Sequence, residues 1–169
     1  NNVFVLDNGG VTSGPQRIQK FDSNGTFISK WGTGGTADGE LDDAVQIAVD
    51  SSGNIYITGG TQGGFGNYTN AGTWDIFLAK YNSNGVQQWV KQSGTSTEDN
   101  GNAVAIDSSG NIYITGRTSG GDLDGQTNSG RQEIFLIKYN SSGTKLWTRL
   151  LGGGQYAHEV ALDIKIDSS

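Results

Sequence analysis

The sequence predicts an all-β protein built from repeated antiparallel units, and three observations lead to this prediction. The stretch AVDSSGNIYITGG at 48–60 returns almost unchanged as AIDSSGNIYITGR at 105–117. Three tryptophans are equally spaced, 58 residues apart, at Trp31, Trp89 and Trp147. The apolar residues are mostly β-branched or aromatic, and they form short runs between Gly- and Asn-rich turns without a helical period.

Each unit is predicted to contain four strands in a meander. In the second unit the first strand is VQIAV (45–49), the turn DSSGN follows, and the second strand is IYIT (55–58). The third strand, IFLAKY (76–81), precedes a turn of the form Asx-Ser-Asn/Ser-Gly, and the fourth strand contains the tryptophan. The glycines that close these turns, Gly25, Gly85 and Gly143, are expected to supply the positive φ of a tight hairpin.

Four-stranded antiparallel units that repeat around an axis predict a β-propeller. A single domain, 1–169, would hold about three blades: 1–32 with a closing strand at 160–169, then 44–92, then 102–150. Residues 2–6 match a second strand, whereas Ile164 and Ile166 match a first strand. Three blades are too few for a ring, so we expect part of a larger or dimeric propeller. Either two copies exchange these strands in a six-bladed ring, or further blades of a longer protein complete it.

Two long stretches resemble known repeat families. Residues 17–57, RIQKFDSNGTFISKWGTGGTADGELDDAVQIAVDSSGNIYI, resemble an NHL-type propeller repeat. Residues 102–152, which begin NAVAIDSSGNIYITGR and end KLWTRLLG, are similar to the bacterial beta-propeller repeat called SBBP. The resemblance implies a propeller within a large secreted or surface-attached bacterial protein, and it implies no defined activity, because such repeats are scaffolds. A few NHL-like propellers are lyases with His-rich metal centres, but this chain has one histidine.

Composition narrows the classes of partner. The net charge is −6 and the pI is about 4.5, with no basic run, which disfavours a nucleic acid or an anionic membrane surface as partner. No apolar stretch approaches the roughly 20 residues of a membrane-spanning helix. The absence of cysteine excludes disulfides, thiolate zinc sites and cysteine nucleophiles. An acidic chain rich in Asn, Gly, Ser and Thr favours an extracellular or cell-surface location.

Paired carboxylates are the first candidates for chemistry. Asp42 and Asp43 precede a predicted first strand, and Glu98 and Asp99 lie in the corresponding loop of the next unit. Two carboxyl groups that face one bond can hydrolyse a glycoside. Because the pair recurs at the same place in the repeat, a role in loop turns and strand caps is the favoured interpretation.

The loop GDLDGQTNSG (121–130) is a candidate calcium site, with Asp122, Asp124 and Asn128 as oxygen ligands. Its counterpart one unit earlier, GGFGNYTNAG (63–72), has glycines in place of both aspartates. A loop that the fold needs is therefore the favoured interpretation. Calcium is the alternative, and no other cofactor is predicted.

Trp74 and Asp75, near the loop residues Phe65 and Tyr68, form the candidate binding patch. Trp74 is not repeated, since the next unit has Gln132 in its place. Aromatic faces stack on sugar rings, and polar side chains beside them bind hydroxyl groups. Burial of Trp74 against a neighbouring blade is the competing interpretation.

His158 is the single histidine, and its neighbour Glu159 would point to the other side of a strand. No serine has the context of a catalytic triad. We therefore expect a non-enzymatic structural or binding module of a secreted or cell-surface bacterial protein, which presents loops to a protein or glycan. Its other expected partners are further blades of the same polypeptide or a second copy. The alternatives are a lectin-like carbohydrate-binding propeller and a propeller-class lyase or hydrolase that uses His158 or the Asp42/Asp43 pair.

Overall fold

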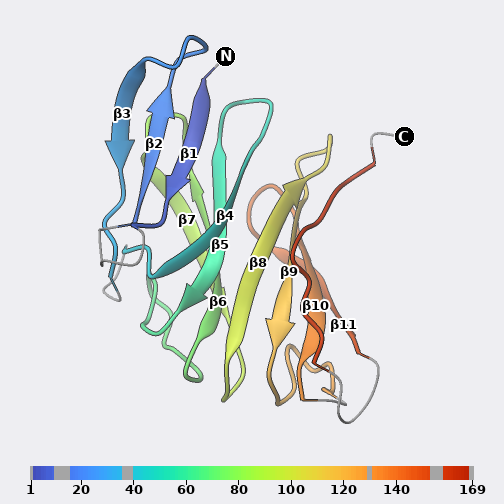
Figure 1. Ribbon diagram of the computed structural model, residues 1–169. Helices are drawn as coiled ribbons and strands as arrows, with labels where there is room; N and C mark the ends of the chain where they lie inside the picture. Colours follow the sequence, from blue (N-terminus) through green and yellow to red (C-terminus); the bar gives the residue numbers. More distant parts are fainter. Residues whose placement is uncertain (1, 10–15, 36–39, 129–130, 153–157, 168–169) are drawn as a thin grey trace.

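The computed structural model describes residues 2–9, 16–35, 40–128, 131–152 and 158–167. Within these ranges the chain forms three antiparallel sheets and no helix, so the all-β prediction is confirmed (Figure 1). Sheet 1 contains β1 (Val3–Asp7), β2 (Arg17–Phe21) and β3 (Phe27–Trp31). Sheet 2 contains β4 (Asp43–Val49), β5 (Ile55–Thr61), β6 (Asp75–Tyr81) and β7 (Gln87–Ser93). Sheet 3 contains β8 (Asp99–Ile106), β9 (Ile112–Thr118), β10 (Glu133–Tyr139) and β11 (Lys145–Leu151).

In each sheet the strands lie side by side in chain order, as a meander requires, and the three sheets stand in a row (Figure 1). The short turns gather at the top of Figure 1; we call this the turn end. The longer connections 62–74 and 94–98 and the loop that follows β9 gather at the bottom; we call this the loop end. The strands of the three sheets span 3–31, 43–93 and 99–151, and the blade bounds 1–32, 44–92 and 102–150 stay a prediction.

The turn end is built from local hydrogen bonds that the repeated sequence encodes. Asp107 Oδ1 accepts hydrogen bonds from the backbone N–H groups of Ser109 (3.0 Å) and Asn111 (2.8 Å). Asp107 Oδ2 accepts hydrogen bonds from Asn111 Nδ2 (2.7 Å) and the Tyr113 hydroxyl (3.2 Å). The Asp50 turn repeats all four contacts. The Asp-Ser-Ser-Gly-Asn stretch is therefore conserved within the chain because it folds the turn.

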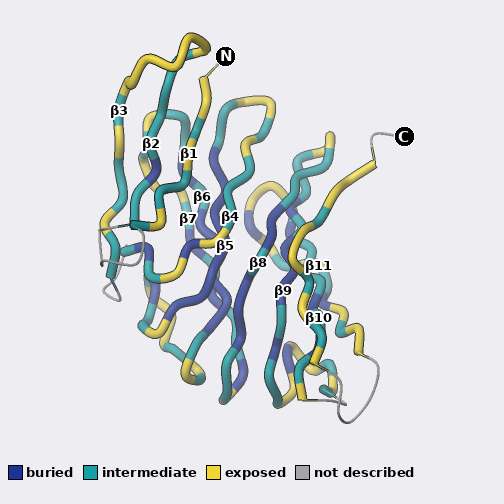
Figure 2. The backbone as a smooth tube through the Cα atoms, viewed as in Figure 1, coloured by how far each residue is buried: buried dark blue, intermediate teal, exposed yellow. Residues whose placement is uncertain are grey.

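The core consists of two apolar layers, one between each pair of neighbouring sheets. The buried stretches of the backbone lie mainly in sheets 2 and 3 (Figure 2). Alternation along β5 sends Ile55 and Ile57 into the layer shared with sheet 1 and Tyr56 into the layer shared with sheet 3. In β6, Ile76 and Leu78 join the second layer. Sheet 2 is thus covered on both faces, which explains why every residue of β5 is buried.

A contact between a tryptophan and a turn glycine joins each sheet to the next at the turn end. A Cβ atom built on Gly85, in the turn of sheet 2, would lie 2.5 Å from Trp31 Cδ2 of sheet 1. One built on Gly143, in the turn of sheet 3, would lie 3.0 Å from Trp89 Cε2 of sheet 2. Glycine lets the indole lie directly on the turn backbone, in addition to supplying the positive φ (81° and 80°).

A lysine accompanies each tryptophan at these junctions. Lys20 Nζ donates a hydrogen bond to the Ser83 carbonyl oxygen at 2.8 Å, and Lys80 Nζ donates to that of Ser141 at 3.5 Å. Both ammonium groups also lie over an aromatic ring of their own sheet, as that of Lys138 does over Tyr113. The junctions are therefore polar at their rim and apolar inside.

Residues 158–167 follow sheet 3 and lie beside β8, not beside β1 (Figure 1). The Glu159 N–H donates to the Gln132 carbonyl oxygen (3.3 Å), as the Asp99 N–H donates to that of Trp74 (2.9 Å). The segment therefore starts from sheet 3 as β8 starts from sheet 2, which agrees with the predicted match to a first strand. It pairs with no strand within the described residues, so completion of the first blade by 160–169 stays a prediction, with 168–169 outside the described residues.

Candidate functional site

The repeat changes its residues mainly at the loop end. Register places Arg117 of β9 where β5 has Gly60, because each lies one position before the final threonine of its strand. Gln132 stands in the place of Trp74, and His158 in the place of Glu98, as the bridges Trp74↔Glu98 and Gln132↔His158 show. Residues that do not follow the repeat are not required by the common fold, so this end is the candidate functional site.

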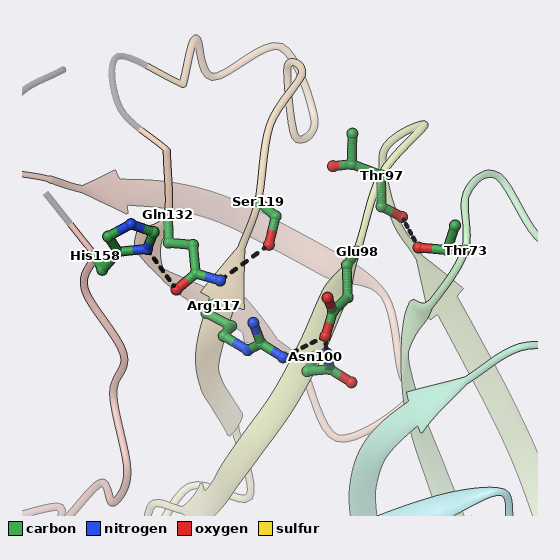
Figure 3. Close-up of polar contacts among 8 residues, drawn as sticks. All are labelled: Thr73, Thr97, Glu98, Asn100, Arg117, Ser119, Gln132 and His158. Atoms are coloured by element: carbon green, nitrogen blue, oxygen red, sulfur yellow. Dashed lines mark hydrogen bonds and ion pairs between the residues drawn. The ribbon is translucent and has the colours of Figure 1, made fainter. Parts of the chain in front are cut away.

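Charged and amide side chains form two linked groups here (Figure 3). The Arg117 guanidinium forms an ion pair with the Glu98 carboxylate, which also accepts a hydrogen bond from Asn100 Nδ2 at 3.0 Å. Gln132 bridges Ser119 (Nε2 to Oγ, 3.4 Å) and His158 (Oε1 to Nδ1, 3.3 Å). Both groups lie at the ends of strands whose positions are fixed by the sheets, so the donors and acceptors are held in place.

Trp74 lies at the boundary between sheets 2 and 3 and is partly exposed. A Cβ atom on Gly60 would lie 2.9 Å from Trp74 Cε3 and 2.2 Å from Asn100 Oδ1. The indole therefore packs over the Gly60 backbone and beside the Asn100 amide. Sequence analysis did not identify Gly60; the change from Gly to Arg at the equivalent position of an otherwise repeated strand was the available signal.

The four residues of the predicted binding patch do not share one surface. Phe65 is 1% exposed and packs edge-on against Phe77, with ring centroids 5.3 Å apart. Asp75 is 2% exposed, and its carboxylate accepts hydrogen bonds from the Ala71 N–H and from Gln92 Nε2, both at 2.9 Å. These two residues fix the 62–74 loop, and Trp74 and Tyr68 (39% exposed) remain accessible.

The predicted calcium loop is held by protein contacts. Asp124 has φ 53°, and Gly66, at the equivalent position of the 62–74 loop, has φ 67°, so both loops make the same left-handed turn. Both carboxylate oxygens of Asp124 lie 2.7 Å from Lys145 Nζ, and Oδ2 also accepts a hydrogen bond from Thr148 Oγ1. Asp122 is exposed and Asn128 is partly buried. Calcium binding at this loop stays a prediction.

The acidic pairs of consecutive units are offset by one residue from the expected match. The Asp99 position, which pairs with the last threonine of β9, corresponds to Asp42, and Asn100 corresponds to Asp43. Asp42 Oδ2 accepts a hydrogen bond from the Gln62 N–H at 2.7 Å, so it caps the loop that follows β5. This contact agrees with the structural interpretation of the acidic loops.

Asp99 is fully buried at the loop end. Burial raises the pKa of the Asp99 carboxyl above its usual value, and the negative charge of Asp75 contributes in the same direction, whereas hydrogen bonds lower it. Thr95 provides two of those bonds, from its backbone N–H (2.6 Å) and from its hydroxyl (2.8 Å). The carboxyl is thus a buried structural acceptor below the surface formed by Glu98 and Arg117.

The fold and the loop end together define an all-β repeat protein. Its sheets pack through the same tryptophan–glycine contact, and its residues differ between units mainly at the loop end. Residues 35–66 and 88–124 match the beta-propeller repeat family SBBP, which confirms the resemblance seen in the sequence. The NHL-like character of the first unit stays a prediction. The described part of the chain contains no helix that is long and apolar enough to cross a membrane.

Two curated proteins are similar to this chain over most of its length. "Regulatory protein FlaEY" of Caulobacter vibrioides is 27% identical over 167 residues, covering 90% of this chain and 17% of that protein. An uncharacterized WD repeat-containing protein, L264, of Acanthamoeba polyphaga mimivirus is 27% identical over 180 residues, covering 88% of this chain and 13% of that protein. The chain therefore spans less than a fifth of the length of these relatives.

Proposed function

We propose that this protein is a non-enzymatic β-propeller repeat module that binds a protein or glycan partner at its loop end. The observation that supports this most directly is that residues shared between the units and residues that differ between them lie at different places in the fold. Residues shared between units fold the turns and join the sheets, whereas residues that differ, such as Trp74/Gln132 and Gly60/Arg117, gather at one end. Binding proteins commonly place recognition residues on loops that a rigid scaffold holds.

The chemistry of this end fits a polar ligand. Glu98, Asn100 and Arg117 offer charged and amide groups, and Trp74 beside them offers an aromatic face. An aromatic face next to amide and carboxylate groups is the combination that binds a sugar ring, so a glycan is the more specific form of the proposal. The acidic, cysteine-free composition supports a secreted or cell-surface setting for the same module.

Binding assays on paired variants test this proposal. Trp74→Ala and Arg117→Gly alter the loop end, and the second introduces the residue that sheet 2 carries at the equivalent position. Ser108→Ala changes an exposed residue at the turn end and serves as the control. We expect binding to a glycan array, or to a purified surface-protein panel, to fall with both loop-end variants and to persist with the control. Equal binding by all three variants would refute the loop end as the binding surface.

Catalysis by the lyase or hydrolase alternative has a separate test. His158→Ala and Asp42→Asn are the variants to compare with the wild-type protein on a panel of glycosides and polyuronides. Turnover by the wild-type protein that either variant abolishes would replace the binding proposal with the enzymatic one.

A further inference from the structure

A pocket between sheets 2 and 3 plays no part in the proposed function. It has a volume of about 400 Å³ and lies between β7, the edge strand of sheet 2, and the turn that joins β10 to β11. We call it the lysine pocket, because Lys91 and Lys145 line it together with Tyr68. Its volume falls in the range of pockets that take small ligands. Neither Arg117 nor Trp74 lines it, so a ligand here would occupy a site separate from the one proposed above.

Two sheets and one loop build the lysine pocket. Tyr139, which is 2% exposed and belongs to the apolar layer between sheets 2 and 3, forms one wall. A Cβ atom built on Gly143 would lie 2.9 Å from Lys91 Cε, so the Lys91 side chain packs on the turn of sheet 3. Tyr68, which is 39% exposed, comes from the 62–74 loop. The pocket therefore exists only because sheets 2 and 3 pack together.

The lysine pocket carries one positive charge that no carboxylate balances. Its described lining residues include two lysines and no acidic side chain, although the whole chain has a net charge of −6. Lys145 Nζ donates hydrogen bonds to Ser93 Oγ (2.5 Å) and to the Asp124 carboxylate (2.7 Å), so its charge is balanced. Lys91 Nζ lies 6.0 Å from the centre of the Trp89 ring and has no hydrogen-bond or ion-pair partner among the described residues. The three N–H donors of Lys91 are therefore available to an anionic ligand.

The common fold does not require the side chains that would contact a ligand. Tyr68 corresponds to Gln126 in the loop that follows β9, since the N–H of each donates to the carbonyl oxygen three residues earlier. Lys91 corresponds to Thr33 in sheet 1 and to Arg149 in sheet 3, because each lies two residues after the repeated tryptophan. The junction between sheets 1 and 2 thus forms without a lysine at this position. Residues that the scaffold does not need are candidates for recognition.

The chemistry of these groups fits a sugar that carries a carboxylate. The aromatic face of Tyr68 can pack against a sugar ring, and an unpaired ammonium forms a strong, charge-assisted hydrogen bond with a carboxylate. The exposed hydroxyl of Thr144 can exchange hydrogen bonds with sugar hydroxyl groups. We propose that the lysine pocket binds a uronate residue of a glycan, with Tyr68 against the ring and Lys91 paired with the carboxylate. This site is independent of the loop-end proposal, and either one can fail without the other.

An NMR titration of the protein with two sugars tests the proposal. The methyl glycosides of glucuronate and glucose differ only at C6, where the first has the carboxylate. We expect the glucuronate glycoside to shift the backbone signals of Gly143 and Thr144 in a saturable way, and to bind at least roughly tenfold more tightly than the glucose glycoside, as one hydrogen bond between charged groups provides. No saturable shift, or equal affinity for both sugars, would overturn the proposal. Equal binding of sodium acetate would also overturn it, because the pocket would then take a carboxylate without a ring.

Variants that exchange residues between units locate the bound sugar. Lys91→Thr introduces the residue of sheet 1 and should remove the preference for glucuronate, whereas Tyr68→Gln should weaken the binding of both sugars and keep the preference. Lys30→Thr removes the same charge from an exposed position of β3 and should bind as the wild-type protein does. An unchanged preference in Lys91→Thr, or an equal loss in Lys30→Thr, would contradict the proposed site. Shifts confined to the surroundings of Trp74 would contradict it too, and would support the loop end instead.

Discussion

The contribution of the tryptophan–glycine contact to the free energy of unfolding can be measured by replacing three equivalent glycines, which differ in the atoms that surround them. Gly25, Gly85 and Gly143 close the same turn in the three sheets, with φ of 81°, 81° and 80°. Replacement by alanine therefore carries the same backbone cost at each, about 1 kcal/mol for a left-handed conformation. The three sites differ in what the new methyl group meets.

The expected order follows from the contacts of that methyl group. At Gly25 it meets nothing within 4 Å, so Gly25→Ala should lower the free energy of unfolding by the backbone cost alone. At Gly85 it would lie 2.5 Å from Trp31 Cδ2, and overpacking of this kind adds about 1–3 kcal/mol. At Gly143 the closest atoms are Lys91 Cε at 2.9 Å and Trp89 Cε2 at 3.0 Å, and the flexible lysine can move, so the loss should be intermediate.

Denaturant unfolding of the three single variants is the appropriate assay. A further control, Gly85→Ala combined with Trp31→Ala, should show a smaller additional loss from the glycine change than Gly85→Ala does alone. Equal losses at all three glycines would refute the view that the tryptophan–glycine contact joins the sheets.

Three other changes test the polar framework. Because the pKa of Asp99 is raised above its usual value of 3.8 by burial, the folded state holds this proton more tightly than the unfolded state. Stability should therefore fall as the pH rises from about that value through the folded pKa, and Asp99→Asn should flatten this slope in urea unfolding measured from acidic to neutral pH. Asp107→Ala should lower the free energy of unfolding by about 1–2 kcal/mol through loss of four hydrogen bonds, and Asp107→Asn should lower it less, which the melting temperatures of the two variants would show. Calcium should raise the melting temperature of the wild-type protein but not of Asp124→Gly if the 121–130 loop binds it, and equal responses would exclude a role for that carboxylate.

The strands and turns could be predicted because their signals are local. Alternation along β5 and β6 fixes which apolar residues enter each of the two layers, and the Asp50 and Asp107 turns are each encoded by five consecutive residues. The match of Ile164 and Ile166 to a first strand rested on the same kind of signal, and the hydrogen bond from Glu159 to Gln132 agrees with it.

The site was harder to predict because it depends on contacts between units. Phe65 looked like a surface loop residue between glycines, but Leu123 at the equivalent position is also buried, and this shared apolar character was the overlooked signal. Asp42 was matched to Glu98 because the connections between units differ in length, and only the strand register shows that its counterpart is Asp99. The Arg117–Glu98 ion pair joins residues that are far apart in the sequence, so no local sequence pattern predicts it.

Sheet 2, which is covered on both faces, shows where the stability of this protein resides. Its buried apolar residues are divided between the layer with sheet 1 and the layer with sheet 3, so each junction contributes a separable share. A unit inserted or deleted as a whole would leave a tryptophan facing a glycine at every remaining junction. Recombination between the near-identical stretches 48–60 and 105–117 could therefore lengthen or shorten the protein by one sheet and keep this contact, with adjustment needed only where the layers differ, as at Ala79 and Ile137.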